Sequence, residues 1–251
     1  MLAYPAVLLC AAIALTFAAE ALLRGSAADA AAFLADPRRP GLATVALVAV
    51  ALAGLDAAMR RRTQAMLLAA PALLALAWIG REKLFYLGDP PYPTDFLYAR
   101  QIAELLPLMV AERPMAATRM VLGALAVALL VAVGWRWSRR LSPMGPGGRA
   151  ARLAIALPLL GTFAVQMDHA GHSPLRSGLK VEPMMWDQKA NYAHNGLVMA
   201  FLLNVPMANV ASPDGYSARA LATIPVDRRH ATKIDVDALH DRLRPESQED
   251  Y

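Results

Sequence analysis

Residues 2–23, LAYPAVLLCAAIALTFAAEALL, decide the fold class of this chain. The stretch carries Glu20 as its only acidic or basic residue, and it is long enough to cross a bilayer as a helix. It has no basic residue before its apolar run and no clean small-residue cleavage site. We therefore predict a retained membrane-spanning helix rather than a cleaved signal peptide.

The composition of the whole chain supports a membrane protein. Of the 251 residues, 57% are hydrophobic and 18% are charged, and the mean hydropathy is +0.36, which is too high for an ordinary soluble domain. A net charge of +5 would suggest a nucleic-acid partner for a soluble protein. Here the arginines lie beside apolar segments, as membrane orientation requires, so we predict no nucleic-acid binding.

Four further apolar segments are long enough to be spans. They are residues 42–58, 64–79, 115–135 and 153–167. Pro71 lies inside one of them, which a membrane helix tolerates when its neighbours satisfy the freed carbonyl. Residues 24–40 are expected to form a polar loop. The predicted fold class is an all-α polytopic membrane protein, with about five transmembrane helices in a domain that covers residues 1–185.

Arginines set the predicted orientation in a bacterial inner (plasma) membrane. Residues 60–62 are all arginine and fill the second loop, and the fourth loop, 136–152, is also strongly basic. By the positive-inside rule both loops face the cytoplasm. The N-terminus is then cytoplasmic, and the chain from Met167 onward is periplasmic or extracellular. The first loop, 24–40, also carries arginines, which argues against this orientation.

The third loop, residues 81–114, is too long for a simple connection. Its segment 88–93, GDPPYP, is expected to be extended because the prolines fix φ. Thr94 or Asp95 can then cap a helix over about 95–112, in which apolar and polar residues recur at helical spacing. We predict an amphipathic helix in the plane of the lipid headgroups. The alternative is a helix packed on the membrane bundle.

A second unusual stretch, residues 186–217, precedes a polar linker or tail at 218–251. Its apolar run Leu197–Leu203 is far too short to cross a bilayer. Asn195-Gly196 predicts a turn or a helix start before the run, and Pro206 predicts its end. We predict a short juxtamembrane helix at the membrane surface or under an outer domain. The alternative is an ordinary buried helix.

Two motifs carry a family resemblance. The first is Lys83-x-x-Tyr86-Leu87-Gly88-Asp89-Pro90-x-Tyr92-Pro93-x-Asp95-Phe96-Leu97. The second is Asn191-Tyr192-x-x-Asn195-Gly196, then an apolar run that ends Phe201-Leu202-Leu203-Asn204, then Pro213-x-Gly215-Tyr216-Ser217. In this order and at this approximate distance they resemble the N-terminal membrane domain of lipoteichoic acid synthase-like phosphoglycerol transferases, which belong to the sulfatase and alkaline-phosphatase superfamily.

That resemblance implies an architecture and an activity. In the family, the second motif joins the membrane domain to an extracytoplasmic catalytic domain, which uses a hydroxyl nucleophile and a divalent metal, usually manganese. That domain transfers glycerol phosphate from phosphatidylglycerol to a polymer or glycan. Its Ser-Glu-Ser-like turn is absent from these residues, so no catalytic residue and no cofactor is assigned to this chain. The residues assigned to the juncture are Asn191, Tyr192, Asn195, Gly196, Phe201, Asn204 and Tyr216.

Candidate binding residues lie in the third loop. We predict contacts to lipid headgroups for Asp89, Tyr92, Asp95, Arg100 and Gln101, because arginine can hold a phosphate bidentately and the other side chains offer hydrogen bonds. Structural roles in caps, turns or a docking surface are the alternative.

Three other polar features do not lead to a predicted functional site. Glu20 and Asp56 lie near span ends, where an intramembrane charge often has a function but can also reach the interface. Asp168-His169-x-x-His172 offers metal-ligand types, but a site needs three or four ligands and no other His or Cys cluster is nearby. We predict no metal site here and interpret these residues as a helix exit.

The predicted function is that of a membrane anchor which presents lipid. The chain would hold an extracytoplasmic catalytic domain or partner subunit and present a membrane lipid, phosphatidylglycerol in the family, for transfer to an extracytoplasmic polymer or a periplasmic glucan. A non-enzymatic membrane scaffold or partner-binding subunit is the alternative. A small transporter is a third hypothesis, but the spans hold few central polar residues and show no inverted repeat.

Overall fold

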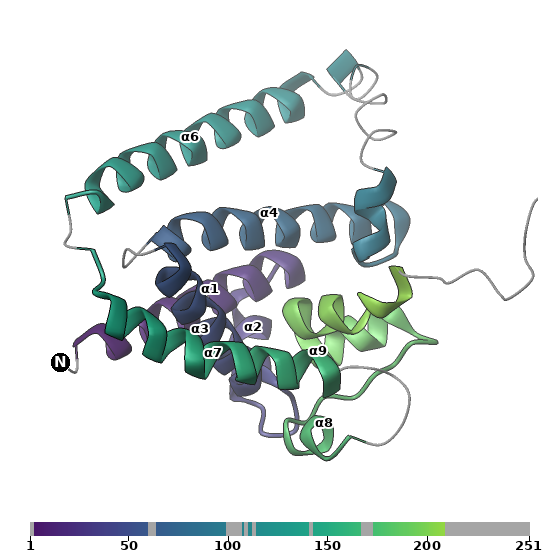
Figure 1. Ribbon diagram of the computed structural model, residues 1–251. Helices are drawn as coiled ribbons and strands as arrows, with labels where there is room; N and C mark the ends of the chain where they lie inside the picture. The colour runs from purple at the N-terminus through teal and green to yellow at the C-terminus, as the bar shows by residue number, and fades with distance from the viewer. Residues whose placement is uncertain are drawn as a thin grey trace, which may run out of the picture. The chain divides into compact units, whose positions relative to one another are not determined.

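Five long helices account for the apolar segments. In the computed structural model they are α1 (Ala3–Arg24), α3 (Gly41–Met59), α4 (Gln64–Leu87), α6 (Pro114–Ser138) and α7 (Pro146–Gln166), as Figure 1 shows. Each is long and apolar enough to cross a membrane. The structure describes residues 3–59, 64–98, 107, 110–111, 114–140, 143–166 and 173–208, and this part of the chain contains no strand. The predicted all-α, five-span membrane fold is confirmed.

Three connecting regions are more helical than their sequence suggested. The predicted fourth loop, 136–152, is helical at both ends, because α6 runs to Ser138 and α7 already begins at Pro146. The expected polar loop at 24–40 contains α2 (Ala27–Ala35), so that prediction was wrong: the Ser26 side chain accepts a hydrogen bond from the backbone N–H of Asp29 and caps an alanine-rich helix. α4 continues past Ile79 to Leu87, because the residues after Gly80 contain no helix breaker until Gly88, whose φ of +66° ends the helix.

The remaining elements are short and lie in the two motif regions. η1 (Pro93–Tyr98) follows α4, while α8 (Pro174–Gly178), α9 (Gln188–Leu203) and η2 (Pro206–Ala208) follow α7. α9 is broken at Gly196, whose φ is +74°, so the expected turn before the apolar run is present inside a longer element. Most of the predicted helix at 95–112, and all of the tail at 218–251, lie outside the described residues.

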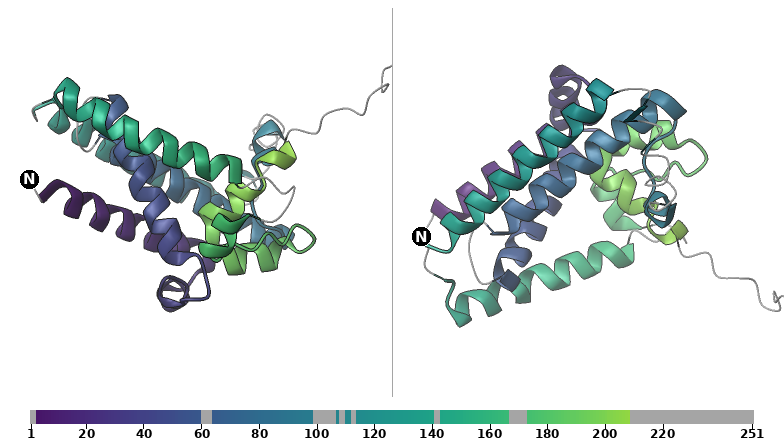
Figure 2. Two further views of the ribbon diagram at one scale, coloured as in Figure 1. Left: turned by 60° about the horizontal axis from the view of Figure 1, so that its bottom comes forward. Right: turned by 90° about the horizontal axis from the view of Figure 1, so that it is seen from above.

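The helix ends sort onto two ends of the bundle. The first, which we call the arginine-rich end, brings together the N-terminal ends of α1, α4 and α7 with the C-terminal ends of α3 and α6. Hydrogen bonds there join Tyr4 to Asp56, Gln64 to Ser138, and Arg149 to the Ala57 carbonyl. The second, the juncture end, brings α9 against the C-terminal ends of α1 and α4. Both views in Figure 2 show α9 at that end. This alternation is what five successive crossings require.

The core is formed by α1, α3 and α4, with α7 packed against α3. Small and medium apolar side chains fill it, among them Ala12, Leu15, Val48 and Leu52. α9 joins this core through its second half, where Leu197, Met199, Ala200 and Leu203 are fully buried. In contrast, the main helix contact of α6 is with α4. Most of the described large apolar side chains of α6 are exposed. Such a surface suits lipid.

Candidate functional site

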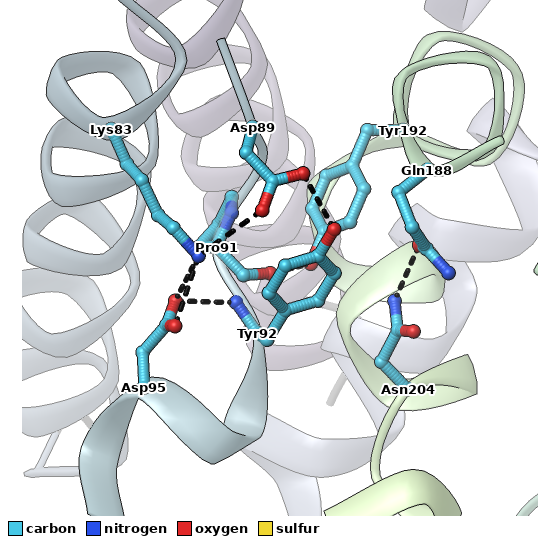
Figure 3. Close-up of polar contacts among 8 residues, drawn as sticks. All are labelled: Lys83, Asp89, Pro91, Tyr92, Asp95, Gln188, Tyr192 and Asn204. Atoms are coloured by element: carbon cyan, nitrogen blue, oxygen red, sulfur yellow. Dashed lines mark hydrogen bonds and ion pairs between the residues drawn. The ribbon is translucent and has the colours of Figure 1, made fainter. Parts of the chain in front are cut away.

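The two motifs, more than a hundred positions apart in sequence, meet at the juncture end. The hydroxyl of Tyr192 in α9 donates a hydrogen bond to the carbonyl of Pro91, in the loop between α4 and η1. The rings of Phe96 and Phe201 pack edge to face, with centroids 6.1 Å apart. Pro91 and Tyr192 are buried. The described parts of the two motifs therefore form one assembly, which we call the juncture cluster, and Figure 3 shows its polar contacts. Residues 213–217 of the second motif lie outside the described residues.

Lys83 holds the loop side of this cluster. Its ammonium nitrogen, Nζ, lies 2.8 and 2.9 Å from the two carboxylate oxygens of Asp95, and 3.7 Å from a carboxylate oxygen of Asp89 (Figure 3). Nζ also lies 4.2 Å from the centroid of the Tyr92 ring. A second ammonium nitrogen, Nζ of Lys189, lies beside this loop, since a Cβ added at Gly88 would be 3.6 Å from it. Two cations and two carboxylates therefore lie at the loop, and the carboxylates can accept hydrogen bonds from a hydroxyl donor.

Tyr92 closes the loop through two hydrogen bonds. Its backbone N–H donates to Asp95 Oδ2 at 2.7 Å, which starts η1, and its hydroxyl donates to Asp89 Oδ1 at 2.6 Å. Burial, with the carboxylate of Asp89, raises the pKa of Tyr92 above its ordinary value, and burial does the same for the pKa of Tyr192. Both phenols therefore keep their protons at physiological pH and act as donors.

An ion pair from the first span is inserted at the break in α9. Arg24 Nε lies 2.8 Å from Glu20 Oε2, and the Glu20 side chain is almost fully buried. Glu20 Oε1 accepts a hydrogen bond from the backbone N–H of Leu197 at 2.6 Å, while Arg24 Nη2 donates to the carbonyls of Tyr192 and Ala193. The anion thus meets the N-terminal end of the second half of α9, and the cation meets the C-terminal end of the first half. Both pairings complement the helix dipoles.

Gly196 makes this arrangement possible. Its φ of +74° is unfavourable for a residue with a side chain. A Cβ at this position would lie 2.5 Å from Glu20 Oε1 and 2.6 Å from Cζ of Phe33. The glycine therefore supplies both the backbone turn and the space in which the carboxylate of α1 reaches the amide of Leu197.

Buried asparagines complete the cluster. Asn195 holds the segment before α9 in place: its Nδ2 donates to the Glu182 carbonyl at 2.6 Å and its Oδ1 accepts from the Glu182 N–H at 3.0 Å. Asn191 and Asn204 both donate to Oε1 of Gln188, at 3.0 and 2.9 Å. All three asparagines are buried. Asn195 thus pairs both backbone groups of Glu182, and Asn204 also donates to the Ala200 carbonyl at 2.9 Å, so these amides satisfy buried backbone groups.

Among the predicted lipid-contact residues, Asp89, Tyr92 and Asp95 come together in the juncture cluster. Asp95 binds Lys83 and the Tyr92 backbone, which agrees with the alternative that these residues have structural roles in caps and turns. The Asp89 side chain is 44% exposed and accessible to a ligand. Arg100 and Gln101 lie outside the described residues. Contact of these five residues with lipid therefore remains a prediction.

Of the predicted juncture residues, the structure places Asn191, Tyr192, Asn195, Gly196, Phe201 and Asn204 in or against α9. Tyr216 lies outside the described residues. The sequence analysis did not single out Lys83, Arg24 or Gln188 as functional. A lysine at the end of an apolar helix beside two nearby aspartates was a signal for the first, but nothing in the sequence linked residue 24 to α9.

No group of metal ligands is found in the described part of the chain. Residues 3–59, 64–98, 114–140, 143–166 and 173–208 bring no three His, Cys, Asp or Glu side chains together as metal ligands. The segment Asp168-His169-x-x-His172 lies outside the described residues. What the juncture cluster offers chemically is hydrogen bonding by carboxylates, amides and phenols on fixed helix ends.

Comparison with known proteins gives one relative. The chain is 45% identical over 219 residues to a protein of Rhizobium meliloti (strain 1021) named "Putative cyclic beta-1,2-glucan modification protein". The alignment covers 86% of this chain and 34% of the relative, so the chain spans about a third of the relative's length. No protein-family profile and no solved structure matches the chain.

Proposed function

We propose that this chain is the membrane portion of a glucan-modifying phosphoglycerol transferase. It would anchor an extracytoplasmic catalytic domain and present the lipid donor, phosphatidylglycerol, for transfer of glycerol phosphate to a cyclic β-1,2-glucan. The relative's name supports the glucan, and the resemblance of the two motifs supports the phosphoglycerol chemistry. The observation that carries the proposal is that these two motifs form one cluster, through Tyr192 with Pro91 and Phe96 with Phe201.

The geometry favours a role in positioning rather than in chemistry. α9 is fixed to α1 by Glu20 and Arg24 and to the loop by Tyr192, so it offers a fixed attachment point at this end of the bundle. Exposed aromatic side chains surround this end, including Phe85, Tyr86 and Trp186. Aromatic residues at one end of a span bundle typically mark the headgroup level. The cluster therefore lies where a headgroup and a catalytic domain would meet.

The carboxylates of the cluster indicate which part of the donor they would contact. The glycerol end of phosphatidylglycerol carries hydroxyl donors, and the Asp89 carboxylate, whose side chain is 44% exposed, is an acceptor for them. The phosphate would then lie away from Asp89 and Asp95. The family's divalent metal, usually manganese, would be held by the catalytic domain, and no residue described here is assigned to it.

In this proposal, the juncture end faces the periplasm and the arginine-rich end faces the cytoplasm. The support is that the basic loops 60–62 and 136–152 flank helix ends that the structure gathers at one end. Cysteine labelling in whole cells tests it. Ser217→Cys should react with a membrane-impermeant maleimide and Ser142→Cys should not, once Cys10 has been replaced by alanine. External labelling at position 142 would contradict the orientation.

A transfer assay tests the function. The protein from the complete reading frame is placed in proteoliposomes of phosphatidylglycerol, and cyclic β-1,2-glucan is added outside. The expected products are glycerophosphorylated glucan and diacylglycerol. Asp89→Asn should raise KM for phosphatidylglycerol about fivefold or more, as expected when a charged hydrogen bond becomes a neutral one. The matched variant Asp29→Asn, on exposed α2, should not. If the wild type makes neither product, the scaffold alternative replaces the proposed function.

A further inference from the structure

The arginine-rich end holds an apolar groove. It has a volume of about 190 Å³ and opens between α1, α3, α4 and α6. Its lining is almost entirely apolar. The residues used below are Tyr4, Val7, Asp56, Leu67, Gly134 and Trp137. The groove lies at the opposite end of the bundle from the juncture cluster, so the proposed function does not use it.

α6 meets α4 near this end at two described points, Gly134 against Leu67 and Ser138 against Gln64. A Cβ at Gly134 would lie 2.6 Å from Cδ2 of Leu67, so the glycine lets the two helices meet there. The described large side chains of α6 are otherwise mostly exposed, and α6 is not among the close neighbours of α1. A groove that is lined by apolar side chains and lies within the spans suits an acyl chain and not a polar ligand.

Charged side chains lie at the end of the groove: the Asp56 carboxylate lines it and accepts a hydrogen bond from Tyr4, and two arginines of α7, Arg149 and Arg152, lie beside it. Arg152 lies over the ring of Tyr4, with Cζ 4.0 Å from the ring centroid, and Tyr4 lines the groove. One guanidinium nitrogen of Arg152, Nη1, is buried and has no hydrogen-bond partner among the described residues. Arg149 lies one turn earlier on α7 and donates to the carbonyls of Ala57 and Ala58. Arginines between membrane helices at such an end bind anionic headgroups.

The depth of the groove in the membrane is consistent with a bound lipid. Trp137 lines the groove and is 59% exposed, near the end of α6 and just before Arg139 and Arg140. A tryptophan in that position typically lies at headgroup level. The apolar part of the groove then lies at the depth of acyl chains, and Arg152 lies at the depth of phosphates.

We infer that this groove binds an anionic phospholipid, with one acyl chain between α1 and α6 and the headgroup phosphate near Arg152. This lipid is distinct from the donor at the juncture end, and the inference does not depend on the proposed function.

Native mass spectrometry of the purified full chain, titrated with dioleoyl phosphatidic acid or dioleoyl phosphatidylcholine, tests the inference. Phosphatidic acid carries no glycerol headgroup, so its binding does not report donor binding. The wild type should bind phosphatidic acid more tightly than phosphatidylcholine. Arg152→Gln should weaken phosphatidic acid binding about fivefold and leave phosphatidylcholine binding unchanged. The matched variant Arg140→Gln, whose side chain is exposed, should change neither by as much.

A second pair of variants tests the acyl part. Val7→Trp fills the groove from an exposed position, and Leu130→Trp places the same bulk on an exposed position of α6 outside it. Val7→Trp should reduce binding of both lipids, and Leu130→Trp should not. Equal effects of the two tryptophans, or equal binding of the two lipids by the wild type, would overturn the inference. Displacement of phosphatidic acid by inorganic phosphate would also overturn it, because it would indicate a phosphate site without an acyl site.

Discussion

The two ends of the bundle use the same device for different purposes. At each end, a carboxylate within an apolar helix accepts a hydrogen bond from the backbone N–H at the start of another helix. Glu20 Oε1 lies 2.6 Å from the nitrogen of Leu197, and Asp56 Oδ1 lies 3.0 Å from the nitrogen of Ala65. In both cases the anion meets the positive end of a helix dipole in a place that excludes water, where such an interaction is strong.

The difference lies in what each carboxylate connects. Asp56 of α3 binds the start of the next helix, nine positions later, and the hydroxyl of Tyr4 in α1 at 2.5 Å, so it holds together the ends of three spans. Glu20 binds a residue 177 positions later and is paired with Arg24, which binds the other side of the same helix break. An acid in a span can therefore be a structural cap rather than a reactive group. Of the two carboxylates, Glu20 is the one that, with Arg24, connects the juncture to the membrane bundle.

The largest expected effect is that of Glu20→Ala. It leaves the guanidinium of Arg24, whose side chain is 13% exposed, without its anion, and it leaves the N–H of Leu197 unpaired. Breaking one side of a buried ion pair costs about 3–5 kcal/mol. α9 should become sensitive to protease while the spans remain inserted. Limited proteolysis and thermal unfolding in detergent measure both. If α9 stayed protected, Glu20 would not be the link that holds it.

Gly196→Ala should come next. The alanine would adopt an unfavourable positive φ, and its Cβ would displace Glu20 or Phe33. We expect a loss of about 2–3 kcal/mol. Gly161→Ala is the matched control, because its Cβ would meet nothing within 4 Å. The same thermal unfolding experiment compares them. A loss no larger than that of the control would mean that α9 is not broken at this residue.

Asp56→Asn should have a smaller effect, in a different place. The amide can still accept one hydrogen bond from Ala65 or Tyr4, but the charge that strengthens both bonds is lost. We expect a loss of about 1–2 kcal/mol. The protease resistance of α9 should be that of the wild type. Loss of α9 protection in this variant would show that the two ends are coupled, which contradicts the separation of roles.

The spans could be predicted from the sequence because hydrophobicity over a long window is a local property. The break in α9 was also visible, since Asn195-Gly196 has the chemistry of a turn. The helix at Ala27–Ala35 was missed because its loop looks polar at both ends, although Ser26 is an ordinary N-cap residue. The extension of α4 to Leu87 was missed because charged residues after Ile79 end the apolar pattern without ending the helix.

The long-range contacts of the site could not be predicted in this way. Asp89, Tyr92 and Asp95 are neighbours in sequence, so their grouping could be anticipated. The contact of Tyr192 with Pro91, and that of Glu20 with Leu197, join segments whose proximity depends on how the spans pack. Neither pattern nor propensity contains that information. Only the order of the two motifs, taken with the family resemblance, suggested that they belong together.

The central claim is that the juncture cluster positions the functional outer part of the protein. The variant Phe201→Asp, made in the protein from the complete reading frame, tests this claim most directly. Phe201 packs on Phe96, so the change places an unpaired charge between the two motifs. Ala31→Asp, at an exposed position of α2, is the control for the added charge. We predict normal membrane insertion for both variants, and loss of glycerophosphate transfer to cyclic β-1,2-glucan for Phe201→Asp alone. Unchanged transfer and unchanged protease resistance in the inserted Phe201→Asp protein would contradict the account.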